Sequence, residues 1–473
     1  MSNIKNYNDE FISRNISKTI SNIDNTIKVD VNFDILRKDF YISEKRAALY
    51  YINGMVREDL FERLQEFFLS IDNEKWPANC KEFDMKNLPY IEVDYSDEKE
   101  KIEYAFYSGV SILVVEGYDE ALLIDARTYP VRAVSEPSKY RVLRGSRDGF
   151  VETLIQNTAL IRRRIRSNDY RCEILEAGKS SRTDIAICYM DSRVDRKLLD
   201  DIKERIKNID TDALTLSQES LAECILKGSY INPFPKFRYT ERPDTTASSI
   251  LEGQIALMVD TSPAAILLPT TIFDVIEEAD DYYFPPITGT YLRFARFLIT
   301  IVSLFLTPIF LLWYNNPVLV PDRLMFIIDV RDSYIPLFWQ MILLELSIDG
   351  LKLAAVNTPT MLNTPLSLIA AVVIGEFAVE SGWFLPQTML YMSVAAIANF
   401  THENYEFAYA LKFCRIMMLI LVYLFGVFGL VCGALITVSM IVFNKTLTNT
   451  SYIYPLYPLD VKKLWQRFIR VRK

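Results

Sequence analysis

Hydrophobic and polar positions are arranged differently in the two parts of this 473-residue chain. Up to about Tyr283 charged residues recur every few positions, whereas beyond Arg296 they become sparse and long apolar runs dominate. The first arrangement is typical of soluble α/β units and the second of membrane helices. We therefore expect a cytoplasmic α/β region of two small mixed units, joined near Pro285 to an all-α transmembrane helical bundle.

The composition along the chain predicts five segments. Residues 1–40 contain no Gly or Pro and are expected to be a variable or flexible lead-in. Residues 41–143 and 144–285 are expected to form the first and the second cytoplasmic α/β unit. Residues 286–456 follow as the membrane helical domain, and residues 457–473 as a basic cytoplasmic tail.

Short patterns predict the elements of the first unit. Apolar residues at helical spacing from Tyr41 to Phe68 favour one or two amphipathic helices. The runs Ser111–Val115 and Ala121–Asp125 are rich in β-prone residues and are separated by a Gly-containing, turn-like stretch. These two runs predict a pair of strands.

Helical and β-prone runs alternate in the second unit, which favours a small mixed sheet covered by helices. A helix is expected within Val151–Ile165. Further helices are expected near 195–207, 218–226, 246–251 and 273–278, and strands near 172–175, 184–189, 255–259 and 264–268.

A membrane span needs about 20 residues, and we take the four strongest apolar runs as candidate spans. They are Phe297–Tyr314, Pro365–Val379, Phe384–Phe400 and Phe413–Phe443. Arg293 and Arg296 before the first run, and the basic tail from Asp460, both predict a cytoplasmic location, so the number of crossings should be even. We expect four, with Ile335–Val356 semi-inserted, re-entrant or packed within the bundle; six crossings by short helices remain an alternative.

Composition excludes several function classes. The net charge of −8 gives little support for binding nucleic acid. A single histidine, His402, argues against a His-based catalytic triad or a multi-histidine metal site. Six cysteines without paired short spacing suggest reduced, buried thiols. We therefore expect no catalytic residues, no metal and no cofactor.

Three stretches carry a family resemblance. EPSKYRVLRGSRDGFVETLIQNTALIRRRIR (Glu136–Arg166) resembles the hallmark segment of the A-subunit family of bacterial spore germination proteins, the GerA family. The stretches Leu343–Gly382 and Leu390–Phe400 are similar to the membrane region of that family, most closely to its SpoVAF branch. One departure is the loop Thr401–Tyr405, which reads Thr-His-Glu-Asn-Tyr where relatives tend to have Thr-Pro-Ser-Tyr.

The resemblance implies a non-enzymatic subunit of a spore inner-membrane complex. In the family, A subunits are thought to form a homo-oligomeric ring that passes ions. Members of the SpoVAF branch are thought to work beside nutrient receptors with a small membrane partner. The implied partners are therefore the lipid bilayer, further copies of the chain and other germination membrane subunits.

Two acidic pairs lie in the apolar region, where ionisable groups are costly and often functional. Glu345 and Asp349 are four residues apart, as are Glu376 and Glu380, so each pair shares a face if its segment is helical. Such pairs could line an ion pathway in an oligomer. Alternatively, Glu345 and Asp349 lie near an interface and pair with Lys352, while Glu380 caps a helix end.

Glycines and a proline mark positions of close packing or bending. Gly426, Gly429 and Gly433 would let another helix approach, and Gly429 and Gly433 have the small-xxx-small spacing. Packing is the simpler interpretation, and a bend in a gating helix is the alternative. Pro308 could kink the first span in the same way.

The segment that carries the resemblance is also rich in arginine and glycine. An anion or nucleotide site is one interpretation, but the sequence has no Gly-x-x-x-x-Gly-Lys pattern. A loop that enters a helix with Asp148 near its cap is simpler. The arginines could instead pair with a neighbouring subunit or with lipid headgroups. The motif residues are Arg144, Gly145, Arg147, Asp148, Gly149, Asn157, Arg162, Arg163 and Arg164.

Two functions of different class follow. The first is an oligomeric spore germination membrane subunit that conducts or gates ions. The second is a non-conducting scaffold that recruits germination partners, in which Glu376→Gln would be tolerated. A membrane enzyme has no supporting nucleophile with a base, metal cluster or phosphate loop in the sequence.

Overall fold

The computed structural model describes residues 11–69, 71, 76–77, 79–87, 92–128, 145–226, 232–328, 333–357, 376–444, 446–447 and 451–470. Contacts divide the chain into two compact units. Unit 1 comprises residues 1–142, 146–227 and 239–269, and unit 2 comprises residues 143–145, 228–238 and 270–473.

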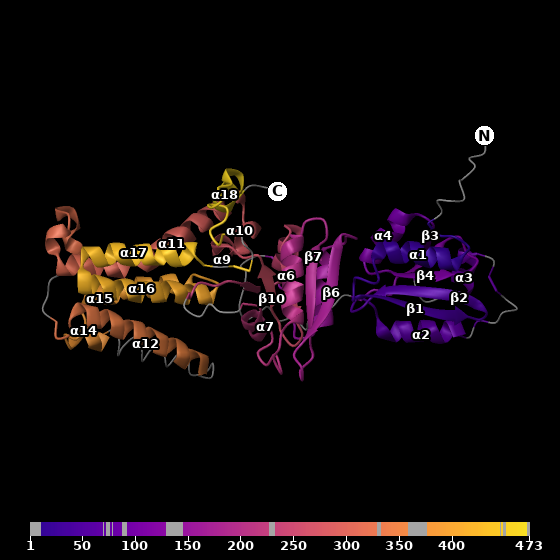
Figure 1. Ribbon diagram of the computed structural model, residues 1–473, viewed down its shortest axis with the longest axis horizontal. Helices are drawn as coiled ribbons and strands as arrows, with labels where there is room; N and C mark the ends of the chain where they lie inside the picture. The colour runs from indigo at the N-terminus through magenta and orange to yellow at the C-terminus, as the bar shows by residue number, and fades with distance from the viewer. Residues whose placement is uncertain are drawn as a thin grey trace. The chain divides into compact units, whose positions relative to one another are not determined.

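Unit 1 begins with a five-stranded sheet of order β1-β2-β4-β5-β3 (Figure 1). The paired strands have antiparallel registers, such as Ile35 opposite Ile52 in β1 and β2. The strands are β1 (Ile35–Ile42), β2 (Lys45–Ile52), β3 (Val93–Ser96), β4 (Ser111–Val115) and β5 (Ala121–Ile124). The helices are α1 (Ile16–Ile27), α2 (Glu58–Leu69), α3 (Cys80–Asn87) and α4 (Lys99–Tyr107).

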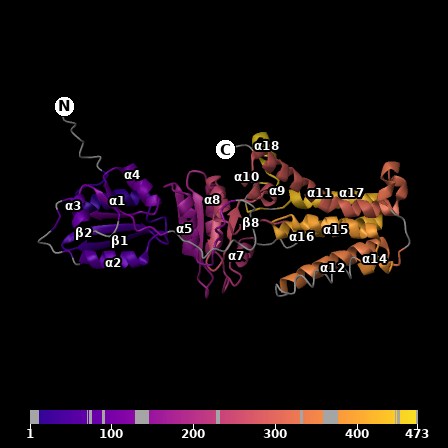
Figure 2. The ribbon, with the colours of Figure 1, turned by 180° about the vertical axis from the view of Figure 1, so that it is seen from behind.

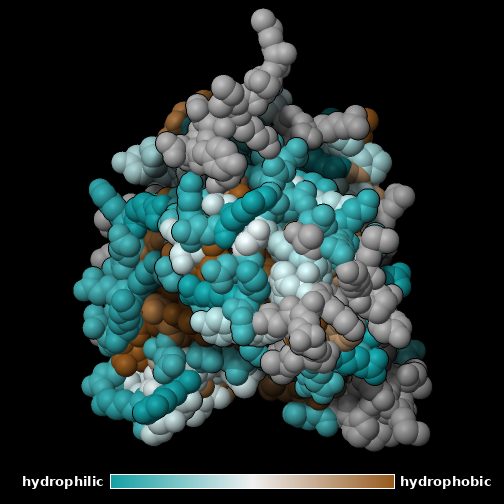
Figure 3. Space-filling model, turned by 90° about the vertical axis from the view of Figure 1, so that its right-hand side faces the viewer, coloured by the Kyte–Doolittle hydropathy of each residue, from teal (hydrophilic) through white to brown (hydrophobic). Residues whose placement is uncertain are grey.

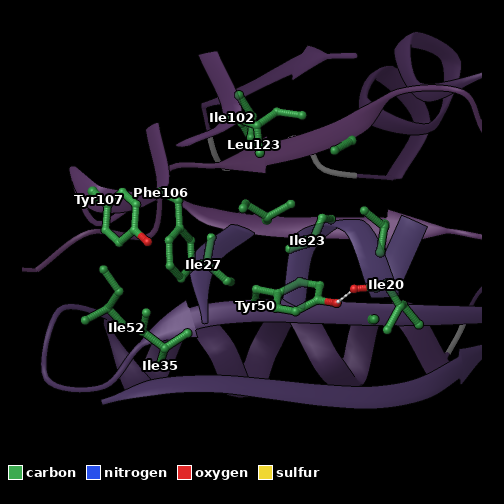
Figure 4. Close-up of a cluster of buried hydrophobic side chains, with 14 of the residues drawn as sticks. Ile20, Ile23, Ile27, Ile35, Tyr50, Ile52, Ile102, Phe106, Tyr107 and Leu123 are labelled. Atoms are coloured by element: carbon green, nitrogen blue, oxygen red, sulfur yellow. Dashed lines mark hydrogen bonds between the residues drawn. The ribbon is translucent and has the colours of Figure 1, made fainter. Parts of the chain in front are cut away.

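Both faces of this sheet are buried, because successive residues of a strand point to opposite sides. Ala48 and Tyr50 of β2 pack in one apolar cluster with the isoleucines of α1 (Figure 4). Their neighbours Ala47 and Leu49 pack in another cluster with Phe61 of α2. The sheet is thus the middle layer between helices.

The second sheet of unit 1 repeats the order of elements found in the first. Each begins with a helix and a hairpin, continues with two helices, a strand and a helix, and ends with a second hairpin. The strand orders correspond, β1-β2-β4-β5-β3 and β6-β7-β9-β10-β8. The second set is α5 (Leu154–Arg164), β6 (Tyr170–Ala177), β7 (Thr183–Met190), α6 (Arg196–Lys207), α7 (Gln218–Ile225), β8 (Arg238–Thr240), α8 (Pro243–Leu251), β9 (Ile255–Val259) and β10 (Ala265–Leu268).

Helices cover both faces of this second sheet too. Figure 1 shows α6 in front of it, and the reverse view in Figure 2 shows α5 and α8. Leu160 of α5 and Ile250 of α8 are buried in one cluster with residues of the sheet. The predicted elements of this part of the chain are confirmed, and so is the α/β class of the N-terminal region.

The expectations for the N-terminal residues were partly wrong. Residues 1–40 were expected to be a variable, flexible or loosely helical lead-in, but Ile16–Ile27 is a well-formed helix and Ile35–Ile42 a strand. The helical interpretation of Tyr41–Phe68 fails in its first part, because Lys45–Ile52 is the second strand of a hairpin. Its apolar run is buried on both faces of a sheet, which hides the two-residue alternation that identifies a strand.

Unit 2 is a helical bundle with short elements at one end. It contains α11 (Pro286–Asn315), α12 (Leu337–Asn357), α14 (Ala378–Glu380), α15 (Pro386–Phe400), α16 (Tyr405–Phe425) and α17 (Val427–Val442). The short helices α9 (Ile272–Ile276), α10 (Asp280–Tyr283) and α18 (Val461–Phe468) lie beside the start of α11 (Figure 1). The all-α architecture expected for this region is confirmed.

Among the residues that the structure describes, two helices, α11 and α16, are long and apolar enough to cross a membrane, and α17 is a shorter apolar helix. The bundle helices also expose large apolar side chains, such as Leu298, Phe428 and Leu435. By contrast, the side of the molecule that faces the viewer in Figure 3, which is the right-hand side of Figure 1, is mostly hydrophilic. An apolar exterior suits helices that are surrounded by lipid or by further helices.

The long span expected over Phe413–Phe443 is wrong, because the chain turns back at Gly426. This residue has φ 56° and ψ −127°, ends α16 and precedes α17. Gly429 then packs against the backbone of Leu421, so the two helices form a hairpin. The segment Ile335–Val356 is largely one helix, α12, packed within the bundle. Most of the expected span Pro365–Val379 lies outside the described residues.

Candidate functional site

A group of charged side chains lies buried among the apolar helices of unit 2. Glu345 in α12 and Arg415 in α16 are only 2% and 1% exposed. Nε and Nη2 of Arg415 each lie 2.7 Å from Oε1 of Glu345. Nζ of Lys412 lies 3.4 Å from Oε2 of Glu345 and also pairs with Asp349, one turn further along α12. Two acids of one helix therefore face two cations of another.

The arginine extends this group to two more helices. Nη1 of Arg415 donates to the backbone oxygen and to Oγ of Ser303 in α11, at 3.0 and 3.1 Å. Oγ of Ser303 in turn donates to Oδ1 of Asn399 in α15, at 3.2 Å. We call this group the buried charge cluster, and it consists of Ser303, Glu345, Asp349, Asn399, Lys412 and Arg415.

The cluster is electrically balanced, because its two carboxylates and two cations cancel. Removing ions from water costs several kcal/mol each, and mutual attraction repays this only when the pairs are close and hydrogen-bonded, as they are here. Loss of a single partner would leave a charge buried and uncompensated. The cluster can thus hold α12 against α16 strongly while all its members remain in place.

The structure places the predicted acidic residues at two separate sites. Glu345 and Asp349 share a face of α12, as their spacing predicted. Glu376 and Glu380 are both exposed and belong to a segment near the start of α12. The chain there is joined to the start of α12, because the backbone N–H of Tyr334 donates to the oxygen of Gly382 at 3.2 Å.

Lys352 is not the partner that the sequence suggested for the first acidic pair. Its Nζ lies 4.4 Å from the ring centre of Phe400 and 5.4 Å from that of Tyr409. Lys412 and Arg415 are the partners instead, and both were missed. A signal was present in the sequence, since they are two cations within an apolar helix and are costly there unless paired.

The glycines of the hairpin lie where a side chain would collide. A Cβ atom on Gly429 would stand 1.9 Å from the backbone oxygen of Leu421, and one on Gly433 would stand 2.6 Å from Cγ of Met418. These distances favour the packing interpretation of both glycines. Pro308 lies inside α11, where it removes one backbone donor.

The arginine of the family motif that matters most for packing is Arg162, which is wholly buried in unit 1. Its Nη2 and Nε lie 2.8 and 2.9 Å from the two carboxylate oxygens of Asp34. Its guanidinium carbon lies 4.3 Å from the ring centre of Tyr170. Asp34 precedes β1 and Tyr170 begins β6, so this arginine in α5 links the two sheets.

The other motif residues form local contacts. Asn157 is buried and accepts a hydrogen bond from the backbone N–H of Val151 at 2.8 Å. Arg163 and Arg147 are exposed and Gly149 is buried. Arg144 lies outside the described residues.

Asp148 does not cap the helix that follows it, so that expectation was wrong. The backbone N–H of Leu154 at the start of α5 donates instead to Oδ1 of Asp260, at 3.1 Å. Asp148 pairs with Arg164 in the last turn of α5. Burial would raise the pKa of Asp148, but hydrogen bonds from Ser146 and Arg164 outweigh burial and lower it.

The space beside Gly145 is closed. A Cβ atom on this residue, which has φ 129°, would stand 2.4 Å from the ring of Tyr283. The motif thus provides packing, with no open phosphate loop among its described residues.

A second charged group lies where α11 begins. Oδ1 of the fully buried Asp281 is 2.5 Å from Nη2 of Arg296, and Oε1 of Glu277 is 2.6 Å from Nη2 of Arg293. Glu278, 3.1 Å from Arg296, is also part of this group. Burial raises the pKa of the Glu278 carboxyl to about 7, although the arginine acts in the opposite direction.

The loop that departs from the family pattern is well packed. Oδ1 of Asn404 accepts from the backbone N–H of Phe407 at 3.0 Å and so caps α16. His402 is 5% exposed, and its ring centre lies 5.1 Å from that of Phe407. Burial, together with the charge of Arg296, lowers the pKa of His402 to about 4.

Within the part of the chain that the structure describes, no three or more His, Cys, Asp or Glu side chains gather as a metal site would require. What the described part of unit 2 does show is ion pairing between helices.

Comparison with known proteins gives the family. The pattern of the Bacillus/Clostridium GerA spore germination proteins matches residues 21–473. Stage V sporulation protein AF of Bacillus subtilis (strain 168) is 38% identical over 463 residues, 98% of this chain and 94% of that protein. Spore germination protein KA of the same organism is 26% identical over 469 residues, 97% of this chain and 85% of that protein.

One solved structure is also similar. It is the crystal structure of the N-terminal domain of the A subunit of the Bacillus megaterium spore germinant receptor GerK3. The similarity covers 55% of this chain and 96% of that one, with 24% identity and a TM-score of 0.43. The resemblance that Glu136–Arg166 suggested is confirmed by the sequence matches. The chain belongs to the GerA family of Bacillus/Clostridium spore germination proteins.

Proposed function

We propose that this chain is a membrane subunit of a spore germination complex, that several copies assemble, and that α12 moves relative to α16 to gate ion flow. The observation that carries the proposal is the buried charge cluster. Its ion pairs join α12 to α16, and charged side chains such as Glu345, Lys412 and Arg415 are costly when they are buried in an apolar bundle. A simple membrane anchor does not need them.

In this proposal Glu345 and Asp349 act as a latch rather than as a bare lining of the pathway. Paired carboxylates attract a passing cation weakly, because Lys412 and Arg415 already neutralise them. Glu376 and Glu380 are exposed, so they remain candidates for attracting cations at one end of the bundle.

The relatives and the bundle both support a location in the spore inner membrane with the tail on the cytoplasmic side. Homologues act in germination and sporulation, which supports the spore inner membrane as the site. α18 packs against the start of α11, where Phe468 contacts Phe297. The tail and the start of the first span therefore belong on one side of the membrane, and the basic residues at both support the cytoplasmic side.

A non-conducting scaffold is the second candidate. The internal neutrality of the cluster supports it, because balanced pairs can serve packing alone. In that case unit 1 would recruit other germination subunits, and the bundle would only anchor it.

Ion flux through liposomes containing the purified protein separates the two candidates. Glu345→Gln and Arg415→Gln each leave one charge unpaired, so both should raise basal flux if the cluster is a latch. The reversed pair Glu345→Arg with Arg415→Glu should bring flux back toward the wild-type level. Flux that is absent in the wild type and in every variant, with and without a membrane partner subunit, would favour the scaffold.

A further inference from the structure

The C-terminal helix α18 exposes apolar and basic side chains, of which Lys463 has its Nζ 5.3 Å from the ring centre of Tyr454. Val461 and Trp465, one helical turn apart, are 67% and 60% exposed. Lys462 and Lys463 are exposed beside them. The preceding turn adds three large apolar side chains that are more than half exposed, namely Leu456, Tyr457 and Leu459.

Other residues fix α18 in place. The ring centre of Phe468 lies 4.9 Å from that of Phe297 in α11. Nη1 of Arg293 donates to the backbone oxygens of Gln466 and Arg467, at 2.9 and 3.2 Å. These contacts of its C-terminal end hold α18 in place. Val461 and Trp465 are not needed for them and are free to contact something else.

α18 lies beside the part of α11 where charged residues end and the uncharged apolar run begins. Arg293 and Arg296 are the last charges before Phe297–Tyr314, a run of residues without any charge. If this run lies in the hydrocarbon core, α18 lies beside its first turn, at the depth of the lipid headgroups.

The apolar surface is continuous with the exposed face of α11. Phe294, which is 50% exposed, stacks on Phe468, and Leu298 and Ile301 continue the same helix with 62% and 57% exposure. A surface that runs from lipid-facing α11 to an amphipathic helix suits one continuous partner, the bilayer itself.

We propose that α18 is an interfacial helix that binds anionic phospholipid headgroups beside the start of α11. Val461 and Trp465 insert among the headgroups, where tryptophan is favoured, and Lys462 and Lys463 pair with phosphate. Arg467 is engaged within the protein, since it lies 2.7 Å from Asp274. The inference does not depend on ion conduction.

The full-length protein in nanodiscs of phosphatidylcholine tests this proposal. Brominated phosphatidylcholine or brominated phosphatidylglycerol is added as a quencher. The contribution of Trp465 is taken as the fluorescence difference between the wild type and Trp465→Phe. We expect Trp465 to be quenched, and more strongly by the anionic lipid than by the neutral one.

Charge variants show whether Lys462 and Lys463 cause the preference for the anionic lipid. Lys462→Gln and Lys463→Gln should each weaken the preference for the anionic lipid by about five-fold, and high salt should do the same. The matched control is Lys197→Gln in α6, an exposed lysine of unit 1, which should change nothing. Variants are compared only where their thermal unfolding matches that of the wild type.

Two results would overturn the proposal. Trp465 could be quenched by neither lipid, or equally by both lipids at every salt concentration. In the first case, shielding of Trp465 by an added acidic germination subunit would make the surface a protein-binding site.

Discussion

At the scale of single residues, Glu345 is the side chain whose charge matters most to the bundle. Glu345→Gln would leave Arg415 buried without its carboxylate partner, which typically costs about 3–5 kcal/mol. We expect thermal unfolding of the purified protein in detergent to shift to a clearly lower temperature. Glu376→Gln is the control, because that carboxylate is exposed, and its effect should stay within about 0.5 kcal/mol. Equal effects of the two substitutions would contradict the importance of the cluster.

His402 gives a pH prediction that can be measured without interference, because it is the only histidine in the chain. Its pKa of about 4 lies below the ordinary value of 6.5. The folded protein therefore binds fewer protons than the unfolded chain between these values, and stability should fall as the pH is lowered through this window. An NMR titration of the labelled imidazole should show a neutral ring at pH 5. A midpoint near 6.5 would contradict the burial described here.

The sequence could identify Glu345 and Asp349, because an acid in an apolar run is conspicuous. It could not identify their partners with the same ease. Lys412 and Arg415 lie more than 60 positions away along the chain, and only the packing of α12 against α16 brings them together. The cap of α5 was missed for a similar reason, since Asp260 comes from a distant strand end.

At the scale of elements, the α16–α17 hairpin depends on the absence of a side chain at Gly429. Gly429→Val would force the backbone of Leu421 away, and such overpacking costs about 1–3 kcal/mol. The expected result is a lower unfolding temperature in detergent. The control is Gly350→Ala in α12, where a Cβ atom would meet open space and the helix should become slightly more stable. A neutral Gly429→Val would contradict the close approach.

The link between the two sheets of unit 1 makes a second prediction at this scale. Arg162→Met would leave Asp34 buried and unpaired, at a cost of about 3–5 kcal/mol. Adding Asp34→Asn should recover part of this loss, because the second substitution removes the buried charge. Arg163→Ala, at an exposed position of the same helix, is the control for a chemical denaturation series. Additive losses in the double variant would show that the two residues do not act as a pair.

The sequence was informative about elements wherever strands were short and bounded by turns, as in β4, β5, β9 and β10. It failed for β2, whose apolar residues serve both faces of a buried sheet and also fit a helix. It failed again at Gly426, because an apolar run of 31 residues from Phe413 to Phe443 looks the same whether it is one tilted helix or two antiparallel ones. The repeat of the strand order was invisible because topology, rather than residue identity, is what the two sheets share.

At the scale of the whole molecule, an α/β unit with two sheets of the same strand order is joined to an apolar bundle that contains a balanced charge cluster. The family is established by sequence, and gating is the proposal that gives the cluster a purpose. If α12 must separate from α16 for ions to pass, then tying these two helices together should stop the flow. Phe338 and Tyr423 offer a place for such a tie, because their stacked rings are 4.4 Å apart, in the part of α12 before the cluster.

The decisive measurement is ion flux through liposomes that contain Phe338→Cys with Tyr423→Cys, in a chain whose native cysteines have been replaced. Single-cysteine variants serve as controls for modification by the cross-linker alone. The gating account predicts that flux falls when a short thiol-specific cross-linker joins the two helices through a disulfide at each cysteine, and that flux returns when these bonds are reduced. Undiminished flux at complete cross-linking, or no flux in either state, would contradict it.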